Sequence, residues 1–482
     1  MRQYKTMKFI YYDLIFLALF TILIILFLRK NKTKIKKEGI FFLYKTKFGI
    51  KFIDKFSERY KKPLKILSYV VITFGYLGMV AMIVLLIVNA ILLLKLPQSI
   101  AAKAPPIMPF LPYTPQIFKI PGLPDFYFTQ WLIIIIIIAI THEFAHGIFA
   151  KLNNVKIKST GFGFLGPIML AFVEQDEKDM NRKKKKAQLS ILAAGPFSNF
   201  IFGILFILLF LVFFNLSVHP VGILYESAVI NATDFKAIHF DNNYFTKDNI
   251  SQIQNLSQNN LPNKFILETA NNSYIISKSL LFSQLSLIEK PENQSIYIFY
   301  NSPAINASMK GEVLSINGLS VKDKLIFSEL KKITPYQKVE ITTTEKTYEM
   351  ITIPNPLNAS QGFTGITYSS IFDQNTTIAK IQRALSPVKN PFMGYGPRYN
   401  QEVYTFFSLI FFWLIIASIG MSLFNMLPFG FLDGGKFFFL TILAITKSKK
   451  KTALIYRIAN IVILLIFAVM VLIWLFRWIA GV

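Results

Sequence analysis

Trp131-Leu-Ile-Ile-Ile-Ile-Ile-Ile-Ala-Ile140 runs directly into Thr141-His-Glu-Phe-Ala-His-Gly147. The apolar run predicts a helix buried in a membrane or a protein core. Residues four apart lie on one face of a helix, so His142 and His146 can hold one metal ion beside Glu143. The chain has only four histidines, and ionisable groups are costly within an apolar span. The pattern therefore indicates a metal site rather than a chance match.

The remainder of the chain has the composition of a membrane protein. Hydrophobic residues make up 53% of the 482 residues, and the mean hydropathy is +0.46, above the usual range of soluble domains. Runs of about 20 apolar residues have the length that crosses a bilayer. They predict six transmembrane helices, at residues 9–28, 66–94, 128–152, 189–216, 403–427 and 458–475. The first run has no small-residue cleavage site, so we expect a retained helix rather than a signal peptide.

The net charge of +26 is explained by its location beside these runs. Residues 29–65 hold 14 Lys and Arg, residues 151–186 hold 9 and residues 436–457 hold 6, whereas residues 95–125 hold 3. Basic loops stay in the cytosol. The charge therefore predicts a multi-pass protein of the cell membrane, in contact with lipid and not with nucleic acid, whose metal site lies near the cytosolic side.

Residues 217–402 differ from the rest, with 16 Lys and Arg against 15 Asp and Glu. Their mixed composition predicts a folded α+β insert on the extracytosolic side. An internal match at a spacing of about 75 residues, Ser227-Ala-Val-Ile-Asn-Ala-Thr233 with Ser302-Pro-Ala-Ile-Asn-Ala-Ser308, predicts two copies of one module. The second copy resembles a PDZ domain, with an Asn317-Gly318 turn and a helix near residues 325–332; the first, with Asp241-Asn-Asn243, is a degenerate copy.

The predicted divisions follow from these features. We expect a first helix with a basic loop, a membrane core with the two histidines, two PDZ-like modules and a second membrane core, at residues 1–65, 66–216, 217–294, 295–400 and 401–482. PDZ modules bind extended peptides by adding a strand to a sheet edge, so peptide termini are the expected partners of the insert.

A catalytic zinc has three protein ligands and one open position, and the chain has no cysteine. Among its acids, Asp13, Glu143 and Asp433 lie in or against apolar runs. Asp13 is near the outer end of the first run, where we expect a solvated carboxylate. Asp433 ends Asn425-Met-Leu-Pro-Phe-Gly-Phe-Leu-Asp433, a stretch that breaks the helix, and it is the predicted third ligand.

At these residues the chain resembles the site-2 protease family of intramembrane metalloproteases. The family joins HExxH to a later N-x-x-P-x-x-x-x-D-G motif, matched here by Asn425, Pro428, Asp433 and Gly434. A family glycine followed four residues later by a small polar residue is matched by Gly195 and Asn199. The stretch Phe429-Gly-Phe departs from the further prolines of many relatives.

The resemblance implies a zinc endopeptidase that cleaves single-span membrane proteins in regulated intramembrane proteolysis. His142, His146 and Asp433 would bind zinc, Glu143 would be the catalytic base, and Asn199 and Asn425 would bind the substrate. The glycine-rich stretch at residues 159–167 is poorly suited to a helix, and we expect a re-entrant strand pair there, or else a cytosolic loop. A helical substrate must unwind before cleavage, and the edge of this pair could receive it.

Two other classes of protein remain open. A Ste24-like membrane metalloprotease also uses HExxH, but its third ligand would be a glutamate in an apolar span, and Asp433-Gly434 favours the site-2 family. An inactive scaffold that presents PDZ-like modules, or a transporter with intramembrane charges, would have no need to keep both Glu143 and Asp433. Failure of the purified protein to bind zinc would favour the scaffold.

Overall fold

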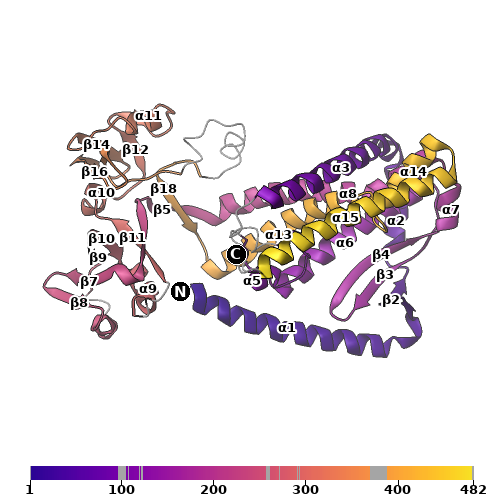
Figure 1. The fold of residues 1–482 in the computed structure, drawn as a ribbon, viewed down its shortest axis with the longest axis horizontal. Helices are drawn as coiled ribbons and strands as arrows, with labels where there is room; N and C mark the ends of the chain where they lie inside the picture. Colours follow the sequence, from indigo (N-terminus) through magenta and orange to yellow (C-terminus); the bar gives the residue numbers. More distant parts are fainter. Residues whose placement is uncertain are drawn as a thin grey trace. The chain divides into compact units, whose positions relative to one another are not determined.

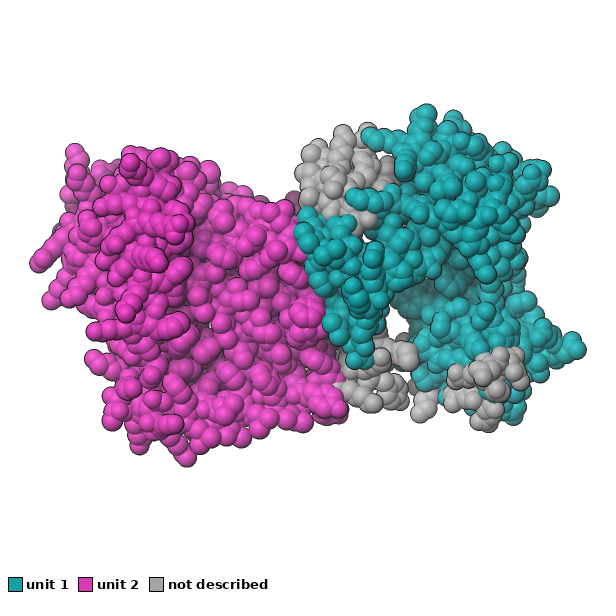
Figure 2. Space-filling model, turned by 180° about the vertical axis from the view of Figure 1, so that it is seen from behind, with its two compact units in different colours: residues 1–4, 211–404 teal, residues 5–210, 405–482 magenta. Residues whose placement is uncertain are grey.

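The computed structural model describes residues 2–95, 105–106, 108–118, 120, 123–256, 261–270, 272–289, 291, 294–369 and 388–479. The chain forms two compact units (Figure 2). One contains residues 5–210 and 405–482, and the other contains residues 1–4 and 211–404. The first unit is predominantly helical and the second is rich in strands.

The described residues include six helices long and apolar enough to cross a membrane, which confirms the predicted number. They are α1 (Arg2–Lys30), α3 (Lys61–Lys95), α6 (Phe128–Leu152), α8 (Lys185–Ser217), α13 (Gln401–Asn425) and α15 (Lys449–Ile479) (Figure 1). Shorter helices are α2 (Ile50–Arg59), α5 (Thr114–Phe118), α7 (Glu177–Arg182) and α14 (Asp433–Thr446). The 14 residues of α14 are too few to span a bilayer, and the sequence analysis did not anticipate this helix.

A four-stranded antiparallel sheet belongs to the helical unit. Its strands, in order, are β1 (Ile35–Glu38), β2 (Phe41–Thr46), β3 (Ile157–Leu165) and β4 (Ile168–Gln175). The strand pair predicted at residues 159–167 is therefore present, as the β3–β4 hairpin. Position 161 of β3 requires glycine. A Cβ there would lie 2.1 Å from the Tyr44 carbonyl oxygen of β2, which is a steric clash. Glycine allows β2 to pack against the hairpin.

Asp13 of α1 is buried rather than solvated, with 2% of its surface exposed, so the prediction of a solvated carboxylate is wrong. Its two oxygens accept hydrogen bonds from the backbone N–H groups of Phe128 (2.8 Å) and Thr129 (2.9 Å). They also accept from the hydroxyls of Thr129 and Tyr113, each at 2.5 Å. Phe128 and Thr129 lie at the first turn of α6, whose free N–H groups attract a carboxylate. Asp13 is thus a cap supplied by another helix.

The second unit begins with a six-stranded sheet in the order β6-β11-β10-β9-β7-β8. The strands are β6 (Ser227–Asn231), β7 (Phe235–Phe240), β8 (Asn243–Thr246), β9 (Lys264–Thr269), β10 (Ser273–Ser277) and β11 (Ser295–Tyr300). Helix α9 (Lys278–Glu289) packs on it over a core that includes Ile238, Leu267 and Leu285. Because β11 lies within this sheet, the sheet continues past the predicted module boundary at residue 294.

A second sheet, in the order β13-β12-β14-β15, follows. Its strands are β12 (Val313–Ile316), β13 (Leu319–Ser320), β14 (Lys338–Thr343) and β15 (Thr347–Ile351), with helices α10 (Pro303–Asn306) and α11 (Ile326–Leu330). The predicted turn is confirmed, since Asn317 and Gly318 have φ of 46° and 74° between paired Ile316 and Leu319. Residues 370–387 of the predicted second module lie outside the described residues.

The predicted repeat fails at its best-matching segment. Residues 227–231 form strand β6, whereas the matched residues 303–306 form helix α10. Pro303 explains part of the difference, because proline suits the first turn of a helix and cannot donate in a strand ladder. The two segments are therefore not structurally equivalent, although both copies keep a two-residue hairpin turn, at Asp241-Asn242 and at Asn317-Gly318.

A two-stranded ribbon closes the insert. Strand β5 (Val218–Ile223) follows α8 directly, and its partner β18 (Met393–Pro397) precedes α13. A second ribbon pairs β16 (Ile353–Asn355) with β17 (Asn358–Phe363). The first strand of the insert, β5, is thus paired with β18, the strand that directly precedes α13.

Candidate metal centre

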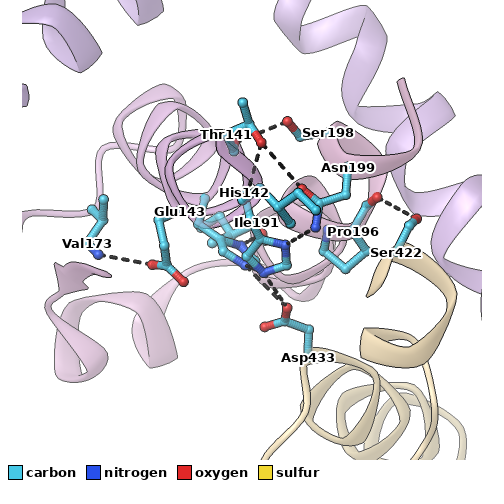
Figure 3. Close-up of polar contacts among 12 residues, drawn as sticks. Thr141, His142, Glu143, Val173, Ile191, Pro196, Ser198, Asn199, Ser422 and Asp433 are labelled. Carbon is cyan, nitrogen blue, oxygen red and sulfur yellow. Dashed lines mark hydrogen bonds and ion pairs between the residues drawn. The ribbon is translucent and has the colours of Figure 1, made fainter. Parts of the chain in front are cut away.

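The three predicted ligands converge in the helical unit (Figure 3). The Nε2 atoms of His142 and His146 are 3.0 Å apart, and they lie 3.2 Å and 3.3 Å from Asp433 Oδ2. A tetrahedral zinc with bonds of about 2.0–2.2 Å holds its ligands roughly 3.3–3.5 Å apart. Two imidazoles and one carboxylate at this spacing fit a zinc ion with three protein ligands.

Helix α6 carries both imidazoles on one buried face. His142 and His146 expose only 8% and 7% of their surface, and their rings meet edge to face with centroids 4.6 Å apart. His146 Nδ1 lies 2.7 Å from the Ile191 carbonyl oxygen of α8. A carbonyl only accepts, so this Nδ1 carries the hydrogen and leaves Nε2 with a free lone pair. The backbone of α8 therefore orients one ligand.

Gly195 allows α8 to approach the rings this closely. A Cβ at Gly195 would lie 2.4 Å from His146 Nε2 and 2.6 Å from His142 Nε2. Real side chains do not reach such distances, so any other residue would displace the imidazoles. One position later, Pro196 leaves the helix without an N–H, and Ser422 of α13 donates to the Pro196 carbonyl oxygen at 2.6 Å. The glycine of the motif therefore has a steric role.

Asn199 lies one turn beyond Gly195 on the same face of α8 and is 1% exposed. Its amide contacts His142 Nδ1 at 3.1 Å, and the other end of the amide lies 3.5 Å from Thr141 Oγ1 (Figure 3). Asn425 is the last residue of α13. Within the described part of the chain, no hydrogen bond joins its side chain to this cluster.

Glu143 points away from the three donors toward strand β4, where its carboxylate accepts the backbone N–H of Val173 at 3.0 Å (Figure 3). The next residue of β4, Glu174, accepts the Ser159 hydroxyl of β3 and pairs with Lys45 of β2 at 3.0 Å. These two partners hold the pKa of the Glu174 carboxyl below its ordinary value. These contacts link β2, β3 and β4 at the position next to the partner of Glu143.

Asp433 is held by the loop that precedes it. The loop follows α13, and Asp433 is the first residue of α14. Within it, Gly430 has φ of 51°, which favours glycine. Helix α15 binds both polar groups of this residue, because Asn460 Oδ1 accepts the Gly430 N–H at 2.6 Å and the Tyr456 hydroxyl donates to the Gly430 carbonyl oxygen at 2.7 Å.

Two comparisons with known proteins bear on the family of this chain. The model of peptidase family M50 matches residues 130–470, which include both histidines and Asp433. This chain belongs to peptidase family M50. It is also 32% identical over 169 residues to the uncharacterized protein MJ0971 of Methanocaldococcus jannaschii. That match covers 34% of this chain and 41% of the relative, so the chain spans about two fifths of the relative's length.

M50 peptidases are intramembrane zinc metalloproteases, and the family resemblance inferred from the motifs is confirmed. The sequence did not reveal the residues that support the site, which are Ile191 beside His146, Val173 beside Glu143, and Tyr456 and Asn460 beside Gly430. Ile191 and Val173 act through backbone atoms, which no motif records. Tyr456 and Asn460 lie four residues apart on an apolar helix, and this spacing was the available signal.

Proposed function

We propose that this M50 peptidase hydrolyses peptide bonds in the transmembrane segments of membrane proteins, in regulated intramembrane proteolysis. His142, His146 and Asp433 hold zinc, and Glu143 is the catalytic base. The observation that carries the proposal is the convergence of three ligand atoms, at 3.0–3.3 Å from one another, two of them on α6, a helix long enough to cross a membrane, and the third at the start of α14. We propose further that the metal lies near the cytosolic side.

A zinc ion held by His142, His146 and Asp433 would supply Lewis acidity, which polarises a carbonyl and makes water acidic enough to be deprotonated near neutral pH. Glu143 accepts a proton as the oxygen of this water forms a bond to the carbonyl carbon. The carbon–nitrogen bond then breaks, and Glu143 delivers the proton to the leaving nitrogen, which becomes an amine. One carboxylate thus acts first as base and then as acid, and for this it must turn from the Val173 N–H, which it accepts in the structure, toward the metal ligands.

The substrate must lose its helical hydrogen bonds before a peptide bond is accessible. Strand β4 is an edge of its sheet, and the N–H of Val173 points away from β3 toward Glu143. Backbone groups alternate in direction along a strand, so those of Ala171 and Met169 lie on the same outer edge. We propose that this hairpin is re-entrant and that the unwound substrate pairs with its edge. We propose that Asn425 contacts the substrate, as its motif implies.

The insert is proposed to lie outside the cell and to contain two PDZ-like modules that filter or dock substrates. A cavity of about 250 Å³ supports peptide binding. It is lined by Leu330, the last residue of α11, by Ile333, and by residues 362–364 and 366–368. Ile366 already pairs with Tyr225 on one side. We propose that a peptide terminus binds in this cavity beside Ile366 and Tyr368, which line it.

A trap experiment tests the proposed activity. Glu143→Gln keeps the size of the side chain but removes its basicity, so we expect hydrolysis to fall by about 10²–10⁴-fold while zinc content and folding stay unchanged. Membrane proteins that remain uncleaved in cells with the mutant identify the substrates. Cleavage by Glu143→Gln at the wild-type rate would refute the mechanism. Wild-type protein without zinc would favour the inactive scaffold.

A further inference from the structure

The two histidine ligands differ in how their tautomers are set. A neutral imidazole binds metal through the nitrogen that carries no hydrogen, and the other nitrogen must then donate. For His146 the donor side is fixed, because Nδ1 faces a carbonyl oxygen, that of Ile191. For His142, Nδ1 faces the Asn199 side-chain amide at 3.1 Å. An amide has one end that donates and one that accepts.

The direction of this amide therefore decides whether His142 is a ligand. In the structure the Asn199 nitrogen faces His142 Nδ1, an arrangement that puts the imidazole hydrogen on Nε2, where it points at Asp433 Oδ2. The two ends of a carboxamide have nearly the same size. A half-turn of the amide brings the oxygen to Nδ1, moves the imidazole hydrogen there and frees Nε2.

We propose that Asn199 is the positioning residue of His142, and that in the zinc-bound protein its amide oxygen accepts a hydrogen bond from His142 Nδ1. The proposal rests on the zinc site proposed above. It differs from the role that the motif suggests for Asn199, which is contact with the substrate backbone. Asn199 is 1% exposed, so its side chain is enclosed by the protein rather than open to a substrate.

Thr141 supplies the partner that the reversed amide needs. Its hydroxyl donates to the carbonyl oxygens of the preceding turn, with Ile137 O at 3.0 Å. The lone pairs of Thr141 Oγ1 are then free to accept from the Asn199 nitrogen, which the half-turn places at this end, 3.5 Å away. Both ends of the buried amide stay paired, as buried polar groups require.

On this interpretation, Gly195 and Asn199 act together to place the two imidazoles. They lie four residues apart and therefore on the same face of α8. Gly195 provides the space for the two imidazoles, and Asn199 accepts the hydrogen of the one imidazole that the α8 backbone does not reach. Outer hydrogen-bond partners of histidine ligands typically contribute a factor of about 10–100 to metal affinity.

The test measures zinc affinity of the purified full-length protein by competition with a chelator. Asn199→Leu removes the acceptor at similar volume, and we expect zinc affinity to fall by about 10–100-fold. Asn199→Asp keeps an oxygen next to Nδ1, and we expect it to bind zinc at least as tightly as the wild type. Ser198→Ala is the matched control, because Ser198 donates to the Thr141 carbonyl oxygen at 3.1 Å without contacting either imidazole.

The outcomes separate the two roles. A substrate-binding Asn199 predicts that Asn199→Leu keeps wild-type zinc affinity and raises KM or lowers kcat, and that result would overturn the proposal. A loss of zinc in Asn199→Asp as large as in Asn199→Leu would also overturn it, since both variants would then act through misfolding. If the wild type binds no zinc, the zinc site itself is wrong, which is a distinct failure.

Discussion

The Asp13 carboxylate of α1 accepts the backbone N–H of Phe128 at 2.8 Å, so one transmembrane helix caps the helix that carries both histidines. A buried carboxylate is expensive unless its lone pairs are satisfied. Four donors satisfy this one, from Tyr113, Phe128 and Thr129. The contact holds the first turn of α6 against α1, and His142 lies further along the same helix.

We expect Asp13→Ala to destabilise the protein by about 1–3 kcal/mol, because it removes a charged cap and leaves buried donors unpaired. Thermal unfolding in detergent measures the effect. Asp54→Ala is the control, since Asp54 forms a partly exposed ion pair with Lys151 at 2.9 Å, worth about 0–1 kcal/mol. Equal changes in the two variants would mean that Asp13 has no capping role.

Removal of a ligand should remove the metal. Wild-type protein should contain close to one zinc per chain, and His146→Ala and Asp433→Ala should each lose most of it, because two remaining ligands hold zinc poorly. Metal analysis after dialysis against a weak chelator gives the answer. Zinc content that stays unchanged in Asp433→Ala would show that another residue is the third ligand.

The clamp on Gly430, formed by its hydrogen bonds to Asn460 and Tyr456, should strengthen zinc binding by Asp433. Tyr456→Phe removes the hydrogen bond to the Gly430 carbonyl oxygen, which is worth about 0.5–1.5 kcal/mol, so we expect zinc affinity to fall by up to roughly tenfold. Tyr76→Phe is the matched control, because Tyr76 contacts the later residue Thr441 of α14 at 3.2 Å. A clamp without influence on Asp433 would leave both variants with the affinity of the wild type.

The insert should restrict access rather than take part in hydrolysis. All proposed metal ligands and Glu143 belong to the helical unit. We expect replacement of residues 217–397 by a flexible linker of about 20 residues, whose reach grows with the square root of its length, to preserve cleavage of a substrate with a trimmed outer domain and to admit an untrimmed one. Cleavage assays with both substrates decide this. A linker variant that binds zinc but cleaves neither would show that the insert belongs to the working site.

The membrane helices and the metal ligands could be predicted because their signals are local. A run of about 20 apolar residues has one stable solution in a bilayer, and two histidines four apart share a helix face. The prediction of Asp433 as third ligand required the other acidic residues to be eliminated, but Asp433 also directly follows an apolar run. Each of these predictions depended on residue type and spacing alone.

The supporting contacts could not be predicted because they join segments far apart in the sequence. Asp13 had the appearance of a surface carboxylate until Tyr113 and the end of α6 were placed around it. The repeat in the insert failed for a related reason. Two similar segments differ in structure, since one forms a strand that pairs with β11 and the other forms a helix that begins at Pro303. Tertiary context decides the secondary structure of such short segments.

The distance along the chain between His146 and Asp433 has a consequence for biosynthesis. Translation proceeds from the amino terminus, so the first two ligands and Glu143 leave the ribosome before the insert, and the third ligand follows only after it. A nascent or truncated chain that stops within the insert has two imidazoles and no carboxylate partner for them. Hydrolytic competence is therefore withheld until nearly the whole polypeptide has been made, and prematurely terminated products lack a complete set of ligands.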